Sequence, residues 1–140
     1  MIAVALFLAA AVQGPYSWST ITDGESVQYG VPQSDDRALR IDCRSEGGLQ
    51  ILGPSGVNTS ENMPTQVTFR RGTERITVLG VTIAMGDGLS FAVPVAATEL
   101  PITTLLAGEP ITIEHGDASW EVPGAGAPAL LRPLVEACAR

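Results

Sequence analysis

The chain lacks lysine entirely: its eight basic residues are all arginine, set against fifteen aspartates and glutamates, for a formal net charge of -7. Nucleic-acid binding needs a basic face that displaces counterions from the phosphates, so this balance argues against that class of ligand. It argues equally against an anionic membrane surface. We therefore expect no nucleic-acid partner.

Histidine and cysteine are also scarce, with one histidine, His115, and two cysteines, Cys43 and Cys138, in 140 residues. A zinc site needs several such ligands close together, and a redox pair needs two cysteines almost adjacent in the chain. The sequence meets neither requirement. We therefore expect no metal site and no cofactor.

The longest apolar run extends from Ile2 to Val12. It is too short to cross the hydrocarbon core of a membrane, which takes about 20 apolar residues. Small residues and the helix-breaking Gly14-Pro15 pair follow it, which is typical of a cleaved export signal. The sequence predicts a signal peptide at 1–13 and a single exported domain at 14–140, periplasmic or secreted and without a transmembrane anchor after cleavage. The alternative is a buried first strand or helix of a cytosolic protein.

An exported compartment would oxidise the two cysteines to a disulfide. Cys43 ends an alternating pattern with Leu39 and Ile41, and Cys138 lies on the apolar side of a C-terminal helical pattern. Closing so long a loop removes about 4 to 5 kcal/mol of chain entropy from the unfolded state. The sequence thus predicts a Cys43–Cys138 bridge, with two unrelated buried thiols as the alternative.

Most of the chain consists of short segments with alternating apolar residues, separated by turn signals rich in glycine, aspartate and serine. This pattern is typical of an antiparallel β-sandwich or a barrel-like fold, so we expect a mainly β protein. The expected strands cover residues 18–21, 26–29, 39–43, 49–52, 66–70, 75–82, 89–95, 111–114 and 119–122.

Two segments have helical spacing instead. Residues 100–107 form a short apolar pattern that stops at Gly108, as a glycine-capped helix does. The C-terminal segment carries a full apolar stripe from Ala127 to Cys138, but Pro133 interrupts it. Because proline removes one helical hydrogen bond, this helix is expected either to start late, near Leu131, or to kink.

Catalytic motifs are weak. His115 lies between predicted strands beside Gly116 and Asp117, where a solvated turn histidine is the simplest interpretation. A small hydrolase would have to combine it with Asp35 or Asp36, two adjacent acids in a turn that is itself typical of solvated surface. No GxSxG motif accompanies them. We therefore assign no catalytic residue and keep this hydrolase as an alternative.

The first candidates for a binding role are the two tryptophans and two tyrosines of the chain. Such side chains near strand ends form platforms for sugars or peptides, although they fill cores more often. Trp120 alternates with Val122 and is expected to be buried. The candidate binding residues are Trp18, Tyr29, Asp35 and Asp36.

The layout resembles that of small exported proteins of Gram-negative bacteria. An export signal, an early Trp18, a strand ending at Cys43, a β-rich middle and a final Gly126-x-x-x-Leu130-x-x-x-Leu134-x-x-x-Cys138 segment are similar to the invasion-associated locus B proteins. The resemblance implies a periplasmic or secreted β-sandwich without established enzymatic activity. It supplies no catalytic residues.

The sequence therefore predicts an exported, non-catalytic binding or accessory protein of the bacterial envelope. Its partner would be another protein or an envelope component. Besides the hydrolase, an acidic inhibitor or immunity-type protein is an alternative, because its charge would steer it toward a basic partner.

Overall fold

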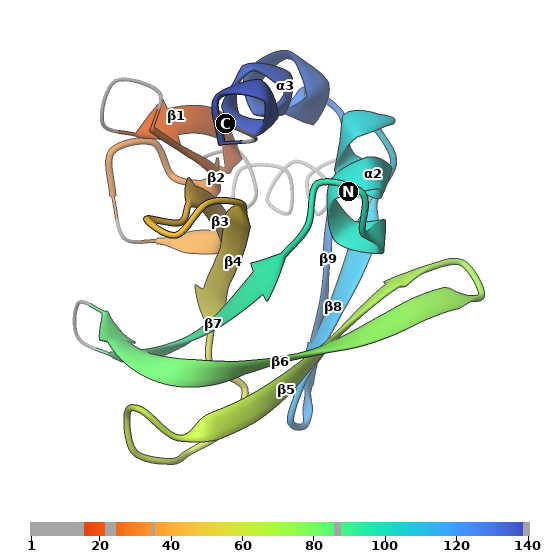
Figure 1. Cartoon of the computed structure of the whole chain (residues 1–140). Coiled ribbons are helices and arrows are strands. Elements are labelled where there is room, and N and C mark those ends of the chain that lie inside the picture. Colours follow the sequence, from red (N-terminus) through yellow and green to blue (C-terminus); the bar gives the residue numbers. More distant parts are fainter. Residues whose placement is uncertain (1–15, 22–24, 35, 86–87, 139–140) are drawn as a thin grey trace, which may run out of the picture.

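A single antiparallel sheet curls into a half-barrel in this structure, a computed structural model that describes residues 16–21, 25–34, 36–85 and 88–138 (Figure 1). The predicted signal peptide, residues 1–13, lies outside the described residues. The strand order is β1-β2-β3-β4-β7-β6-β5-β8-β9, so β1 and β9 are the two edges. The mainly β prediction is confirmed, in its barrel-like form.

Each predicted strand is present, most of them one to three residues longer than the alternating pattern indicated. The described strands are β1 (Ser17–Ile21), β2 (Ser26–Gly30), β3 (Arg37–Cys43), β4 (Leu49–Pro54), β5 (Pro64–Arg71), β6 (Glu74–Met85), β7 (Gly88–Val95), β8 (Ile111–His115) and β9 (Ala118–Val122). The helices are α2 (Leu100–Leu106) and α3 (Ala127–Cys138).

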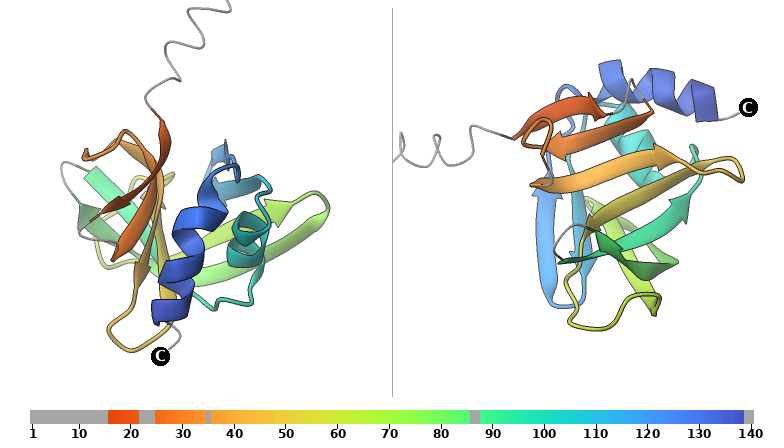
Figure 2. Two further views of the ribbon diagram at one scale, coloured as in Figure 1. Left: turned by 90° about the horizontal axis from the view of Figure 1, so that it is seen from above. Right: turned by 90° about the vertical axis from the view of Figure 1, so that its left-hand side faces the viewer.

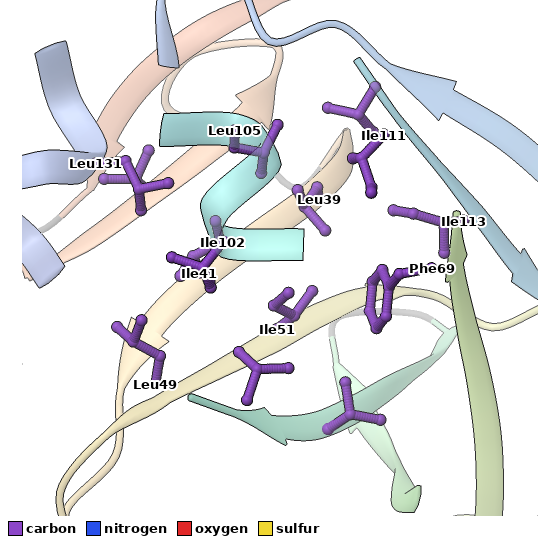
Figure 3. Close-up of a cluster of buried hydrophobic side chains, with 14 of the residues drawn as sticks. Leu39, Ile41, Leu49, Ile51, Phe69, Ile102, Leu105, Ile111, Ile113 and Leu131 are labelled. Carbon is purple, nitrogen blue, oxygen red and sulfur yellow. The ribbon is translucent and has the colours of Figure 1, made fainter. Parts of the chain in front are cut away.

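The concave face of the sheet and the two helices enclose the core (Figure 3). Successive side chains point to opposite sides of a strand, so every second residue, usually an apolar one, faces this side of the sheet. Helix α2 packs against β5 and β8, and α3 packs against α2 and β1 to β3. The central side chains are Leu39, Ile41, Leu49, Ile51, Phe69, Ile102, Leu105, Ile111, Ile113 and Leu131.

Helix α3 lies across one end of the half-barrel, beside β1 and β2 (Figure 2). It runs from Ala127 through Pro133 to Cys138, so the expectation of a late start near Leu131 is wrong. Pro133 and Ala129, whose carbonyl loses its usual partner, are both exposed. Water can therefore solvate that carbonyl, which lowers the cost of the proline. Neither helix in the described residues is long and apolar enough to span a membrane.

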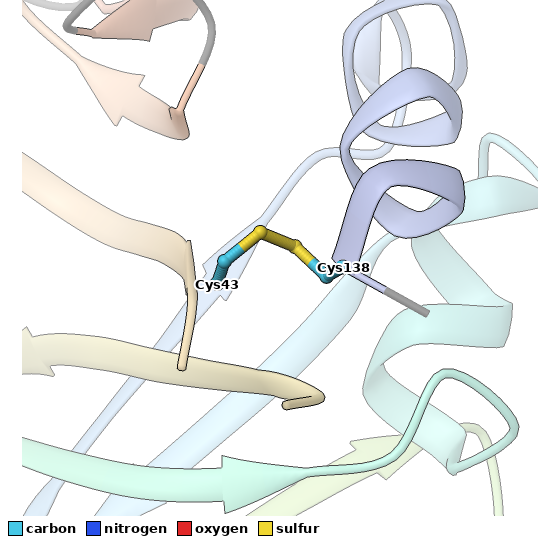
Figure 4. Close-up of a disulfide and its surroundings, with 2 residues drawn as sticks. All are labelled: Cys43 and Cys138. Atoms are coloured by element: carbon cyan, nitrogen blue, oxygen red, sulfur yellow. A yellow bond between two sulfur atoms is a disulfide. The ribbon is translucent and has the colours of Figure 1, made fainter. Parts of the chain in front are cut away.

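The predicted disulfide between Cys43 and Cys138 is confirmed (Figure 4). The two Cα atoms are 5.3 Å apart across a sequence separation of 95 residues. A backbone hydrogen bond of 3.3 Å from the Gly48 N–H to the Cys138 carbonyl oxygen supports the same junction. Cys138 is buried and Cys43 is exposed at the end of β3. The bridge thus fastens the end of α3 to the β3–β4 hairpin.

Removing this disulfide should cost a large part of the stability. A variant carrying both Cys43→Ser and Cys138→Ala should melt more than about 10 °C lower, because its unfolded chain regains the entropy of a long loop. Circular dichroism melts with and without reductant test this. Reductant should lower the melting temperature of the wild type to that of the variant and leave the melting temperature of the variant unchanged. The prediction would be contradicted if the wild type had the same melting temperature as the variant and reductant did not change it.

Candidate functional site

The two edge strands approach one another without pairing, and two tryptophans bridge the gap. The Trp18 indole N–H in β1 donates to the Pro123 carbonyl oxygen just after β9, at 2.9 Å. The Trp120 indole N–H in β9 donates to the Ala38 carbonyl oxygen in β3, at 3.1 Å. We call this region, between β1 to β3 on one side and β9 on the other, the seam. Side chains rather than a backbone ladder hold it together.

A β-bulge makes the Ala38 carbonyl available. Tyr29 pairs with Leu39 and Gly30 pairs with Arg37, so Ala38 has no partner residue on β2. An extra residue of this kind interrupts the ladder and bends the strand. The Ala38 carbonyl oxygen is thereby able to accept the bond from Trp120.

The seam contains a cleft of about 690 Å³, which we call the aromatic cleft. Tyr16 and Tyr29 meet edge to face, with ring centroids 5.6 Å apart and planes at 73°. Trp18 packs against Tyr29 at 5.5 Å and so supports it. Trp18 and Tyr29 pack at the margin of the core, and all three rings are only half-buried. The cleft is lined by Tyr16, Tyr29, Asp36, Ala38, Trp120, Glu121 and Pro123.

Asp36 is held in place by its neighbours. The Tyr16 hydroxyl donates a hydrogen bond to the Asp36 carboxylate. The backbone N–H of Asp36 donates to the Ser34 hydroxyl at 3.0 Å, and its carbonyl oxygen accepts from the Val31 N–H at 2.8 Å. The bond to the carboxylate, together with burial and the negative charge, raises the pKa of Tyr16 to about 12. The tyrosine therefore stays protonated and holds the side chain of Asp36, which lines the cleft.

Titration of the tyrosines should report this contact directly, because the chain has only two of them. Absorbance near 295 nm should show one tyrosine that ionises well above the usual pKa of about 10, at about 12. In Asp36→Asn that transition should move part of the way down toward 10, because the amide oxygen still accepts the hydrogen bond but the carboxylate charge is gone. An unchanged titration curve in Asp36→Asn would show that another group controls Tyr16.

Three further hollows differ in chemistry from the aromatic cleft. Their volumes are about 310, 430 and 360 Å³. Each is lined by at least one arginine, and none by tryptophan or tyrosine. Aromatic and acidic residues, with no basic residue from the described ranges in the lining, therefore distinguish the cleft at the seam.

The structure brings together most of the binding residues suggested by the sequence. Tyr29 and Asp36 line the cleft, and Trp18 packs behind Tyr29. Asp35 lies outside the described residues. Trp120 was expected to be buried; it faces the core but is half exposed at the cleft. Glu121 was missed, since a single acid in an alternating strand carries no local signal of a site.

His115 is not the solvated turn residue that its neighbours suggested, and that expectation is wrong. Only 1% of its surface is exposed. The Gly56 N–H donates to its Nδ1 at 2.8 Å, and its Nε2 lies 2.7 Å from the Thr65 hydroxyl oxygen. The loop between β4 and β5 covers it, and Phe91 packs edge-on at 5.2 Å. A Cβ at Gly56 would overlap the His115 carbonyl oxygen, so this close contact requires glycine.

These contacts fix the ionisation state of the imidazole. Because Nδ1 accepts a hydrogen bond, the proton of the neutral ring must be on Nε2, which donates to Thr65. A second proton on Nδ1 would face the Gly56 N–H. Burial lowers the pKa of His115 below its ordinary value. His115 therefore joins the β4–β5 loop to the β8–β9 hairpin as a neutral side chain.

The arrangement gives the hydrolase alternative no support. The Asp36 carboxylate accepts a hydrogen bond from Tyr16. The two nitrogens of His115 form hydrogen bonds elsewhere, Nδ1 with Gly56 and Nε2 with Thr65. The Ser55 hydroxyl donates to the Val57 carbonyl oxygen at 2.8 Å within its own loop. Within the described ranges, no group of three histidine, cysteine, aspartate or glutamate side chains could hold a metal ion.

The buried histidine should make stability depend on pH. Its pKa is lowered in the folded state, so below about pH 6.5 the unfolded chain binds a proton that the folded chain does not. This contribution to stability is complete above that pH and is lost as the pH falls. The urea midpoint of the wild type should therefore drop between pH 7.5 and 5.5.

Matched variants separate this effect from other titrations. His115→Asn offers Gly56 an acceptor that does not titrate, so its midpoint should fall less over the same interval. Thr65→Val keeps the imidazole and should keep the dependence. Equal drops in the wild type and His115→Asn would assign the effect to other groups.

Comparisons of the chain with protein-family models, curated proteins and solved structures found no match. The resemblance to the invasion-associated locus B proteins therefore stays a prediction from the sequence.

Proposed function

We propose that this is an exported, non-catalytic binding protein of the bacterial envelope that takes its ligand in the aromatic cleft. The observation that carries the proposal is that both tryptophans and both tyrosines gather at one seam. Their rings are half exposed, whereas rings that serve only as core would be covered. Rigid rings that flank a concave site offer a ligand apolar surface at little entropic cost.

The disulfide supports the location. A bridge between Cys43 and Cys138 forms and persists where thiols are oxidised, as in the periplasm or outside the cell. The second indication of an exported location is the apolar run at Ile2 to Val12, which is typical of an export signal. These two features come from separate parts of the chain and indicate the same compartment.

The alternative of an acidic inhibitor or immunity-type protein that binds a basic partner has less support. On the β5–β6 hairpin and beside it, Glu74, Glu109 and Glu114 form ion pairs with neighbouring arginines. Their charges are compensated within the molecule. A binding cleft is the function that the geometry favours over this alternative.

A thermal-shift panel tests the proposal. The probes are choline, cellobiose and trialanine, each added to the wild type, to Trp120→Ala and to the control Leu79→Ala, which changes an exposed residue of β6. At least one probe should raise the melting temperature of the wild type and of the control in a saturable way. Trp120→Ala should lose that shift relative to its own baseline, because one wall of the cleft is gone. Equal shifts in all three proteins, or none, would contradict the proposal.

A further inference from the structure

We propose that the aromatic cleft recognises a small organic cation, an ammonium nitrogen that carries methyl or methylene groups. This inference rests on the proposed function, since it specifies the ligand of the same cleft. It follows from the charges that line the cleft, from the arrangement of its rings and from the fixed position of one carboxylate.

Among the described residues, all charged members of the lining are acidic. They are Asp36 and Glu121, and no arginine of the described part of the chain lines the cleft. The chain as a whole has the same sign, since it has no lysine and a net charge of -7. An anionic ligand such as a phosphate would be repelled, and a cation would be attracted.

The rings suit a cation with an apolar surface. Tyr16 and Tyr29 stand at 73° to one another and both line the cleft, and Trp120 lines it from β9. The face of an aromatic ring carries negative potential, which attracts ammonium groups, and tryptophan is the strongest of the three. Methyl and methylene groups on the nitrogen also pack on the rings, whereas a bare inorganic cation would prefer water.

Asp36 supplies a charge at a fixed position. Its carboxylate accepts the Tyr16 hydroxyl, and its backbone is held by Ser34 and Val31. Because its pKa is raised, the Tyr16 hydroxyl keeps its proton and remains a donor to this side chain. A carboxylate beside aromatic walls complements a cation without needing to rearrange on binding.

The test compares two probes of nearly equal shape. Choline carries a quaternary nitrogen, and 3,3-dimethyl-1-butanol has a neutral carbon in its place. Titrations use calorimetry and the intrinsic fluorescence of the two tryptophans, both at the seam, at constant ionic strength. Choline should bind the wild type about tenfold or more tightly than the neutral alcohol. Equal affinity of the wild type for these two probes, or no binding of either choline or the tripeptide Gly-Lys-Gly, overturns the inference.

Two charge variants locate the effect. Asp36→Asn keeps an acceptor for Tyr16 and should weaken choline binding by about fivefold to tenfold, while leaving the neutral alcohol unaffected. Asp117→Asn removes the same charge from the exposed β8–β9 turn, outside the cleft, and should bind choline like the wild type. Equal losses in both variants would mean that only the net charge matters, which overturns the proposed site.

Further probes identify the source of the cation. They also show whether only the cation inference fails or the proposed binding function fails as well. Binding of the tripeptide Gly-Lys-Gly in place of choline would retain the ammonium chemistry and assign it to a peptide side chain. If cellobiose binds in a manner that depends on Trp120 and neither cation does, the cation inference fails and the binding function stands. If no probe depends on Trp120, both fail.

Discussion

The rest of this structure depends on a sheet that curls far enough to bring its edges together but does not close. Backbone pairing ends at β1 and β9, and the indole N–H groups of Trp18 and Trp120 form the connection instead. A closed ladder would have filled the seam with backbone. Because side chains make the connection, a cleft remains between them, and the rings that hold the seam also line or support that cleft.

The disulfide and helix α3 secure the same part of the molecule from the opposite end of the chain. Helix α3 packs on β1 to β3, and Cys138 ties it to the end of β3. The strands that carry Tyr29 and Ala38 are therefore restrained on two sides. The aromatic rings thus stand on a fixed support, which is what a preorganised binding site requires.

Local pattern predicted the strands well because each has a continuous alternation bounded by turn residues, as in β5 and β6. It failed for His115, where glycine and aspartate neighbours indicated a solvated turn. The residues that bury His115 are Gly56, Thr65 and Phe91, all distant in sequence. The path of the β4–β5 loop over the hairpin decides that contact, and no local periodicity encodes it. The expectation of a late start for helix α3 failed for a similar reason. Packing of its apolar stripe outweighs the one hydrogen bond that Pro133 removes.

The sequence by itself determined the strands, the two helices and the pairing of Cys43 with Cys138, because alternation, helical spacing and cysteine count are properties of short segments or of composition. Tertiary structure alone decided that Tyr16, Asp36 and Trp120 share one cleft. Their meeting requires the first and last strands of a nine-stranded sheet to approach each other, and that approach depends on the accumulated twist and curl of all the strands between them.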